Sequence, residues 1–286
     1  MSMHAIRLNA QLARSLVAVA CAALGILSLA HGEFAPLGQV IAAGNVARGV
    51  WLYGSACLLL LASALCFLPT VLPSVLIIGA YEVAWAILST HQIRASPLSI
   101  GAWYGFCEAM SSLVAPTMLY VAYQLQASND SRPRPSAERA RTAARILAAA
   151  RIVFGLTCVF YGVSHFVYAD YTASMVPRWL PGSLALAYFT GMAHVAAGIC
   201  LIVKLVPRLA AALEALMMSA FGLLVWVPSF FMQPRPKWAT PPGNQWSELV
   251  VTLLLATSAW LLAASLRARA LQRDGDLHQP PRTDIS

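Results

Sequence analysis

Residues 184–203 read LALAYFTGMAHVAAGICLIV and contain no Asp, Glu, Lys or Arg. An α-helix rises 1.5 Å per residue, so a helix of about 20 residues matches the roughly 30 Å hydrocarbon core of a bilayer. His194 is the one side chain of this stretch that ordinarily titrates near neutral pH, and it falls near the middle. The stretch therefore predicts a membrane-spanning helix with one polar position at depth.

The composition extends this interpretation to the whole chain. It has 286 residues, of which 59% are hydrophobic and 10% charged, whereas soluble domains are about 25% charged. So little charge excludes a soluble enzyme, a disordered region and a disulfide-stapled secreted module. Eight windows are apolar enough to span: 12–30, 48–67, 73–90, 99–125, 145–163, 184–204, 209–228 and 247–266. The sequence predicts an all-α integral membrane protein with about eight transmembrane helices.

The basic residues indicate the orientation of these helices. The formal net charge is +8. With the N-terminus in the cytoplasm, 13 Lys and Arg residues fall on the cytoplasmic side and 5 outside, while Arg151 lies within a span. This bias follows the positive-inside rule, so both termini are expected in the cytoplasm and no nucleic-acid partner is needed to explain the charge.

An internal repeat divides the chain. Gly25 and Gly32 recur as Gly155 and Gly162, and the Glu108 region recurs as the Glu248 region. We expect a four-helix unit at 1–125, a basic cytoplasmic linker at 126–144, a second four-helix unit at 145–266 and a polar tail at 267–286. An even number of spans makes the two repeats parallel. Residues 1–30 also resemble a cleaved signal peptide, but the repeat favours a retained helix.

The second half resembles a known family. The segments are Phe160-Tyr161-Gly162-Val163-Ser164-His165-Phe166, Met175-Val176-Pro177-Arg178-Trp179-Leu180-Pro181 and Tyr188-Phe189-Thr190-Gly191-Met192-Ala193-His194. They are similar to the DoxX-like family of bacterial four-helix membrane proteins, over about residues 143–266 and more weakly in the first half. Many members have Glu at the position of His194. The resemblance implies a bacterial inner-membrane location and a quinone-linked or redox-associated role beside a membrane redox partner protein.

Two midplane residues are candidates for ligand binding. Counting along their helices places Glu82 and His194 near the middle of the bilayer, in different halves. Ionisable groups at that depth are costly and need a reason. They are predicted to face each other across the repeat interface, where His194 could hydrogen-bond a quinone carbonyl or relay its protons. The alternative is that each is satisfied within its own bundle.

A second candidate site lies towards the outer face. His165, Asp170, Arg178 and Glu248 are predicted to line an outward-opening pocket beside Trp246. Glu108 is the first-half counterpart of Glu248. The alternative is a network of interfacial hydrogen bonds that holds the outer loops.

Arg151 and Glu214 both fall about 9 Å into the bilayer by residue count. They are predicted to form a structural ion pair that fixes helix packing, with a functional switch as the alternative. No His or Glu pair has metal-ligand spacing, so no metal site is expected. The six cysteines form no CxxC motif and are expected to be packing residues.

Three functions remain open. The first is a redox-associated subunit that binds a quinone, and any enzymatic activity would be that of a quinone-linked oxidoreductase. The second is a small-solute or proton-coupled transporter. The third is a non-catalytic assembly partner. The expected partners are the lipid bilayer, a membrane redox protein or a second copy of the chain.

Overall fold

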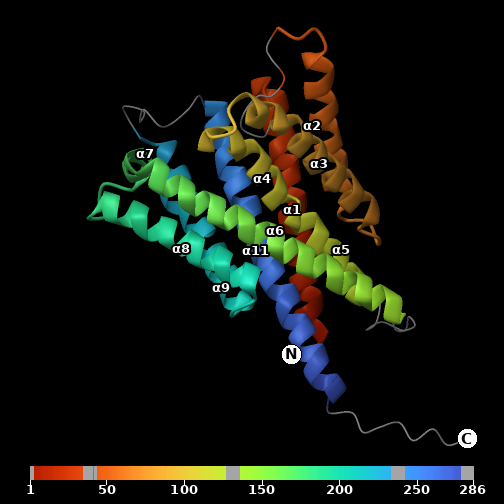
Figure 1. Cartoon of the computed structure of the whole chain (residues 1–286). Helices are drawn as coiled ribbons and strands as arrows, with labels where there is room; N and C mark the ends of the chain where they lie inside the picture. The colour runs from red at the N-terminus through yellow and green to blue at the C-terminus, as the bar shows by residue number, and fades with distance from the viewer. Residues whose placement is uncertain (1–2, 35–40, 42–43, 127–135, 233–241, 278–286) are drawn as a thin grey trace, which may run out of the picture.

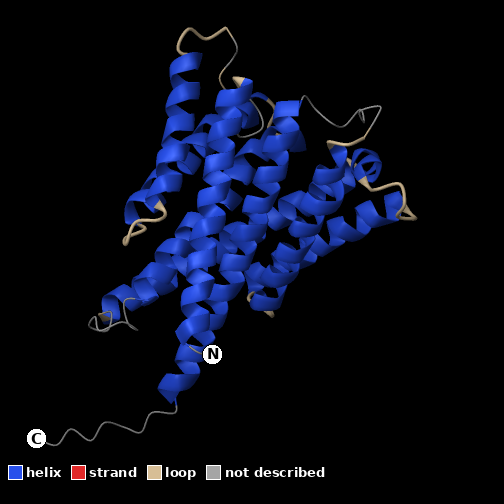
Figure 2. Cartoon of the chain, turned by 180° about the vertical axis from the view of Figure 1, so that it is seen from behind, coloured by secondary structure: helices blue, strands red, loops and turns tan. Residues whose placement is uncertain are grey.

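The computed structural model describes residues 3–34, 41, 44–126, 136–232 and 242–277, and these residues form helices joined by short loops. No strand occurs among them (Figure 2). The helical elements are α1 (Met3–His31), α2 (Arg48–Leu65), α3 (Leu72–Ala95), η1 (Ile100–Trp103), α4 (Tyr104–Ser112), α5 (Val114–Gln126), α6 (Ala137–Val167), α7 (Ala169–Met175), α8 (Ser183–Val203), α9 (Pro207–Phe221), η2 (Gly222–Trp226), α10 (Val227–Ser229) and α11 (Pro242–Leu277).

In the part of the chain that the structure describes, seven helical segments are long and apolar enough to cross a membrane. They correspond to seven of the eight predicted windows. The eighth window, 99–125, was expected to be one helix, but it is interrupted at Leu113 between α4 and α5. Pro116 explains the interruption, because its ring nitrogen has no hydrogen to donate to the carbonyl of Ser112.

The outer faces of the helices are apolar. Leu156, Phe189 and Leu216 lie on α6, α8 and α9, and each is more than half exposed. Large contiguous apolar surfaces are rare on soluble proteins. These faces therefore fit contact with lipid, as in a multi-pass membrane protein.

The helices of each half contact one another in chain order. In the first half α1 packs on α2, α2 on α3, and α3 on both α4 and α5. In the second half α6 packs on α8, α8 on α9, and α9 on α11. The halves meet where α11 contacts α1, α4 and α5, and where α5 contacts α6. The beginning of α1 and the end of α11 lie at the same end of the molecule, and α6 crosses α11 obliquely (Figure 1).

Helix α11 lies at the centre of this arrangement. About 72% of its spanning stretch is buried, against 22% in α2. Leu254 and Leu262 of α11 join a core cluster with Val17 of α1, Met118 of α5 and Leu147 of α6. One apolar core therefore runs through both halves.

Glycines bring α6 and α8 into very close contact. A Cβ added at Gly162 would lie 2.6 Å from the carbonyl oxygen of Gly191, and one at Gly198 would lie 2.5 Å from the carbonyl oxygen of Gly155. Small residues that let two backbones approach are typical of helix pairs in membranes. This contact fixes the relative position of the two helices that contribute the histidines described below.

Two expected boundaries differ from the helix ends. Helix α6 begins inside the expected linker, where the Ser136 side chain caps it by accepting a hydrogen bond from the backbone N–H of Arg139 at 3.3 Å. Helix α11 continues into the expected tail as far as Leu277. Residues 127–135 of the linker and 278–286 of the tail lie outside the described residues.

Candidate functional site

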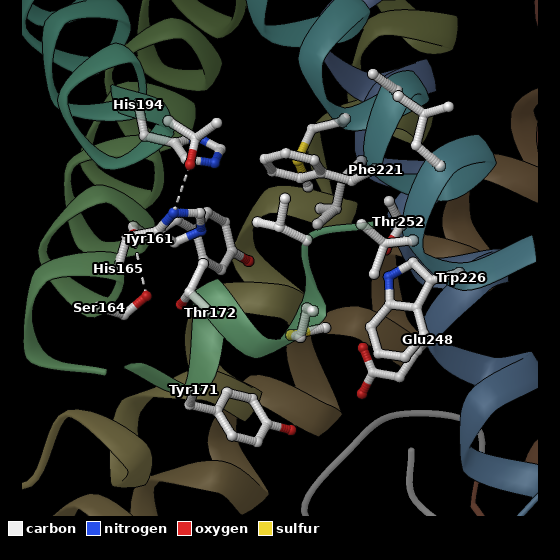
Figure 3. Close-up of a pocket in the computed structure, with 18 of the residues that line it drawn as sticks. Tyr161, Ser164, His165, Tyr171, Thr172, His194, Phe221, Trp226, Glu248 and Thr252 are labelled. Atoms are coloured by element: carbon white, nitrogen blue, oxygen red, sulfur yellow. Dashed lines mark hydrogen bonds between the residues drawn. The ribbon is translucent and has the colours of Figure 1, made fainter. Parts of the chain in front are cut away.

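A cavity of about 690 Å³ lies among α4, α6, α7, α8, α9, η2 and α11 (Figure 3). Its walls are mainly apolar, with Leu, Val, Met and Phe side chains, and a few polar groups converge on it. The polar side chains are Tyr104, Glu108, Tyr161, Ser164, His165, Tyr168, Tyr171, Thr172, Thr190, His194, Trp226, Glu248 and Thr252. This size and mixture are typical of sites that bind small lipophilic molecules.

Four of the seven predicted ligand-binding residues line this cavity: His165, His194, Glu108 and Glu248. Figure 3 shows the two histidines on one side and Glu248, beside Trp226, on the other. The structure thus joins parts of the two sites that the sequence analysis treated separately. It also places Glu108, from the first half, in the wall of a second-half cavity.

The other three candidates lie elsewhere. Asp170 and Arg178 are exposed and do not line the cavity, although Tyr171 and Pro177 beside them do. Trp246, which was expected beside the outer pocket, also does not line the cavity; it stacks on Phe230, with ring centroids 3.9 Å apart. Glu82 is buried in α3 and is not a lining residue.

His194 and Glu214 form a buried pair behind the cavity wall. His194 Nδ1 and Glu214 Oε1 are 2.6 Å apart, and the two side chains are only 2% exposed. The two atoms are within salt-bridge distance, but they are not aligned as a hydrogen bond. His194 Nδ1 and the second carboxylate oxygen, Glu214 Oε2, have no hydrogen-bond partner among the described residues. A carboxylate at this distance holds the imidazole of His194 in place.

This pair replaces two predicted ones. Glu214 was expected to pair with Arg151, but Arg151 instead donates from a guanidinium nitrogen to the carbonyl oxygen of Ile202 at 3.0 Å. His194 does not face Glu82 but Glu214 of its own half, which agrees with the alternative that it is satisfied within its own bundle. The physical reason is the contact between α8 and α9, which brings those two helices together within one bundle.

His165 is held by α8 and by an aromatic neighbour. Its Nδ1 lies 3.0 Å from the Thr190 hydroxyl oxygen and 3.4 Å from the Ala187 carbonyl oxygen. The Thr190 hydroxyl donates to the Leu186 carbonyl at 2.9 Å, so it accepts from His165. Nδ1 therefore carries the hydrogen and Nε2 is a hydrogen-bond acceptor.

The rings around His165 form a small cluster. His165 stacks on Phe221 at 6.0 Å and meets His194 edge to face at 5.1 Å. Tyr161 lies 6.2 Å from His194, and its hydroxyl is 3.0 Å from the Ser111 hydroxyl of α4. The cluster gives the cavity an aromatic wall with polar edges.

Several lining residues were not anticipated. Tyr161 and Thr190 stand in the segments that carry the family resemblance, so their position there was the available signal. Tyr171 lies in α7 outside the spanning helices, where burial and the nearby Glu248 carboxylate raise its pKa. That shift shows that α7 brings its tyrosine close to the acidic side of the cavity.

The π-helical segment η2 shapes one wall. It spans Gly222–Trp226 and supplies Leu224, Val225 and Trp226 to the cavity. Pro228 follows, and because it has no N–H the normal helical bond to Leu224 is lost. Such single-turn bulges occur frequently at functional sites. The pair Gly222 and Pro228 was the sequence signal that could have located this bulge.

No group of three His, Cys, Asp or Glu side chains in the described part of the chain could hold a metal ion. The cysteines of that part are free thiols, and Cys158 lies beside the Glu214 carboxylate. The polar groups of the cavity are thus imidazoles, carboxyls, phenols and hydroxyls, which bind through hydrogen bonds and exchange protons.

Comparison with known proteins gives one match. Residues 154–263 match the model of a family described as a domain of unknown function (DUF8561). This segment runs from α6 into α11 and includes every cavity-lining residue except Tyr104 and Glu108. No curated protein and no solved structure matches the chain. The matched segment, which is less than half of the chain, is therefore similar to a family for which no activity is described.

Proposed function

We propose that the chain is a DoxX-like protein of a bacterial inner membrane, built from two tandem four-helix units with both termini in the cytoplasm. In both halves each helix packs on the next spanning helix along the chain, which supports a duplication. The beginning of α1 and the end of α11 lie at one end (Figure 1). That arrangement requires an even number of crossings, so α4 and α5 together make the eighth.

The function that the geometry supports best is the binding of a quinone or a similar lipophilic molecule in the 690 Å³ cavity. The observation on which this rests is the position of His165 and the buried His194–Glu214 pair at one wall of an otherwise apolar space. A quinone needs apolar walls for its ring and tail and hydrogen-bonding groups for its oxygens. Both are present in one cavity.

His165 suits the reduced form of such a ligand. Its Nε2 is an acceptor, so it can receive a hydrogen bond from a hydroquinone hydroxyl. The imidazole of His194, held by Glu214 and lining the same cavity, supplies a second hydrogen-bonding group for the quinone oxygens. The electrons would be exchanged with a membrane redox partner protein, which makes this chain a quinone-binding subunit of a redox assembly.

The test is quinone binding by the purified chain. We expect solvent extraction and mass spectrometry to find near-stoichiometric quinone in the wild type, and added decylubiquinone to bind. The His165→Phe variant keeps the stacking on Phe221 but removes the acceptor, so decylubiquinone should bind about tenfold more weakly. The matched control is His91→Phe, because His91 is exposed at the end of α3. Quinone at membrane background in the wild type, or equal binding by both variants, would overturn the proposal.

A transporter is the second candidate, because two crossings are irregular. The α4–α5 interruption at Leu113 and the π-helical η2 are the kind of discontinuity that transporters use at substrate sites. Glu248 faces the same cavity. On this hypothesis, proteoliposomes with a pH-sensitive dye inside should show proton flux under an imposed potential, and Glu248→Gln should abolish it. The exposed Glu138→Gln variant is the control. If the chain binds no quinone and carries no proton flux but captures a membrane complex, the non-catalytic assembly role is the function that remains.

A further inference from the structure

Three carboxyl groups, two of them buried and one on the cavity wall, follow one another through the interior. Glu82 of α3 and Glu108 of α4 belong to the first half and are 6% and 7% exposed. Glu248 of α11 belongs to the second half and is partly exposed, on the cavity wall. Glu108 lines the same cavity. The three residues come from three helices that pack on one another, since α4 contacts both α3 and α11.

Each of these carboxyl groups lies within electrostatic reach of the next. Glu108 acts on Glu82, and Glu108 and Glu248 act on each other. In the described part of the chain no Lys or Arg acts on any of them. The other titratable side chains around them include the thiols and phenols of Cys21, Tyr81, Tyr104, Cys107, Tyr161 and Tyr171, and the imidazoles of His165 and His194 line the same cavity. Neighbouring carboxylates in a low-dielectric interior cannot all stay ionised, so the group retains protons.

Buried polar atoms without a partner occur on the two helices that carry the first two carboxyls. Glu108 Oε2, the Tyr81 hydroxyl and Trp85 Nε1 are buried and have no hydrogen-bond partner among the described residues. Tyr81 and Trp85 lie one turn apart on α3, beside Glu82, with their rings stacked at 6.1 Å. Buried polar groups in proteins almost always find a partner, and ordered water supplies it where protein does not. These atoms point to water between α3 and α4.

We propose that Glu82, Glu108 and Glu248 form a proton-holding carboxyl row that runs from the first half of the chain into the cavity. A proton that leaves a hydroxyl of the cavity ligand moves to a carboxylate oxygen of Glu248 or Glu108, which becomes the neutral acid, and no electrons move in this step. Glu108 then exchanges protons with Glu82 through the intervening water. The exchange with a ligand rests on the proposed quinone site, whereas the row itself does not.

The experiment is infrared spectroscopy of the full chain in lipid without added ligand. We expect the wild type at pH 7 to show the carbonyl stretch of protonated carboxylic acid. Glu82→Gln, Glu108→Gln and Glu248→Gln should each lose part of that band. Glu138→Gln and Asp170→Asn, at exposed carboxylates, should keep it whole. Circular dichroism establishes that each variant is folded.

Hydrogen–deuterium exchange of the same band tests the order of the row. Glu82 does not line the cavity, so its proton should exchange through Glu108. We expect Glu108→Gln to slow the exchange of the remaining band, and Glu248→Gln to leave the rate unchanged because Glu108 still reaches the cavity. Equal exchange rates in both variants would overturn the order of the row.

The remaining outcomes separate the row from the ligand site. No protonated band at pH 7, or a band that added sodium removes, would overturn the row and indicate ionised carboxylates or a cation site. A band that is present but does not shift when bound decylubiquinone fills the cavity would overturn the exchange with ligand. Failure of decylubiquinone to bind would overturn the quinone site and leave the row standing.

Discussion

Replacing Gly162 with alanine is expected to loosen the contact between α6 and α8 and to destabilise the fold. The added Cβ would lie 2.6 Å from the Gly191 carbonyl oxygen and 2.9 Å from the Val195 backbone nitrogen. Both are backbone atoms that cannot rotate away, so the helices must separate. Overpacking of this kind costs about 1–3 kcal/mol, and we expect a loss at the upper end of that range.

The measurement is the free energy of unfolding in detergent, followed by circular dichroism. Gly54→Ala in α2 is the control, because a Cβ there meets nothing within 4 Å. It should be neutral or stabilising by up to about 1 kcal/mol, since alanine is the better helix former. Equal stability of the two variants would show that the α6–α8 contact is not as close as described.

The same substitution should weaken ligand binding. His165 stands one turn beyond Gly162 on α6, and its Cβ would lie 2.9 Å from a Cβ added at Gly191. Separation of the helices therefore moves His165 away from Thr190, which holds its Nδ1. Decylubiquinone affinity is expected to fall in Gly162→Ala and to stay unchanged in Gly54→Ala.

The second large effect is expected from Glu214→Ala. Removal of the carboxylate leaves His194 buried without its partner and leaves a cavity beside it. Breaking a buried pair by removing one member costs about 3–5 kcal/mol. Chemical unfolding of the variant in detergent measures this loss, and Glu138→Ala, at an exposed position of α6, should change stability by less than about 0.5 kcal/mol.

A double variant separates the structural role of this pair from its role at the cavity. His194→Gln combined with Glu214→Gln keeps two groups that can hydrogen-bond but removes the buried carboxylate, so most of the lost stability should return. Quinone binding should not return, because the imidazole is still absent. A Glu214→Ala variant as stable as Glu138→Ala would mean that the pair contributes nothing to the fold.

The sequence predicted the class of fold well, because hydropathy is a property of each segment alone. Seven windows became helices of spanning length. The interruption at Leu113 was missed because a proline such as Pro116 either bends a helix or ends it, and neighbouring helices decide which. The bulge at Gly222–Trp226 was missed for the same reason.

Residue counting predicted the depth of the polar side chains but not their partners. Glu214 and Arg151 were predicted to form an ion pair because residue counting places both about 9 Å into the bilayer. Depth says nothing of the direction in which a side chain points around its helix, and α6 is inclined, so equal counts do not give equal heights (Figure 1). Glu214 therefore meets His194, which the count had placed deeper. The cavity could be assembled only once the contacts of α8 and α9 were known.

The central position of α11 has a consequence for the biogenesis of the protein. This helix is synthesised after the other described helices, yet it packs against α1, α4, α5, α6 and α9. Neither half can close while the ribosome is still making residues 242–277, so the earlier helices must wait in the bilayer with their inner faces uncovered. A chain that is truncated before α11 would present those faces to chaperones and proteases. Quality control can therefore recognise an unfinished molecule by the vacant centre of its bundle.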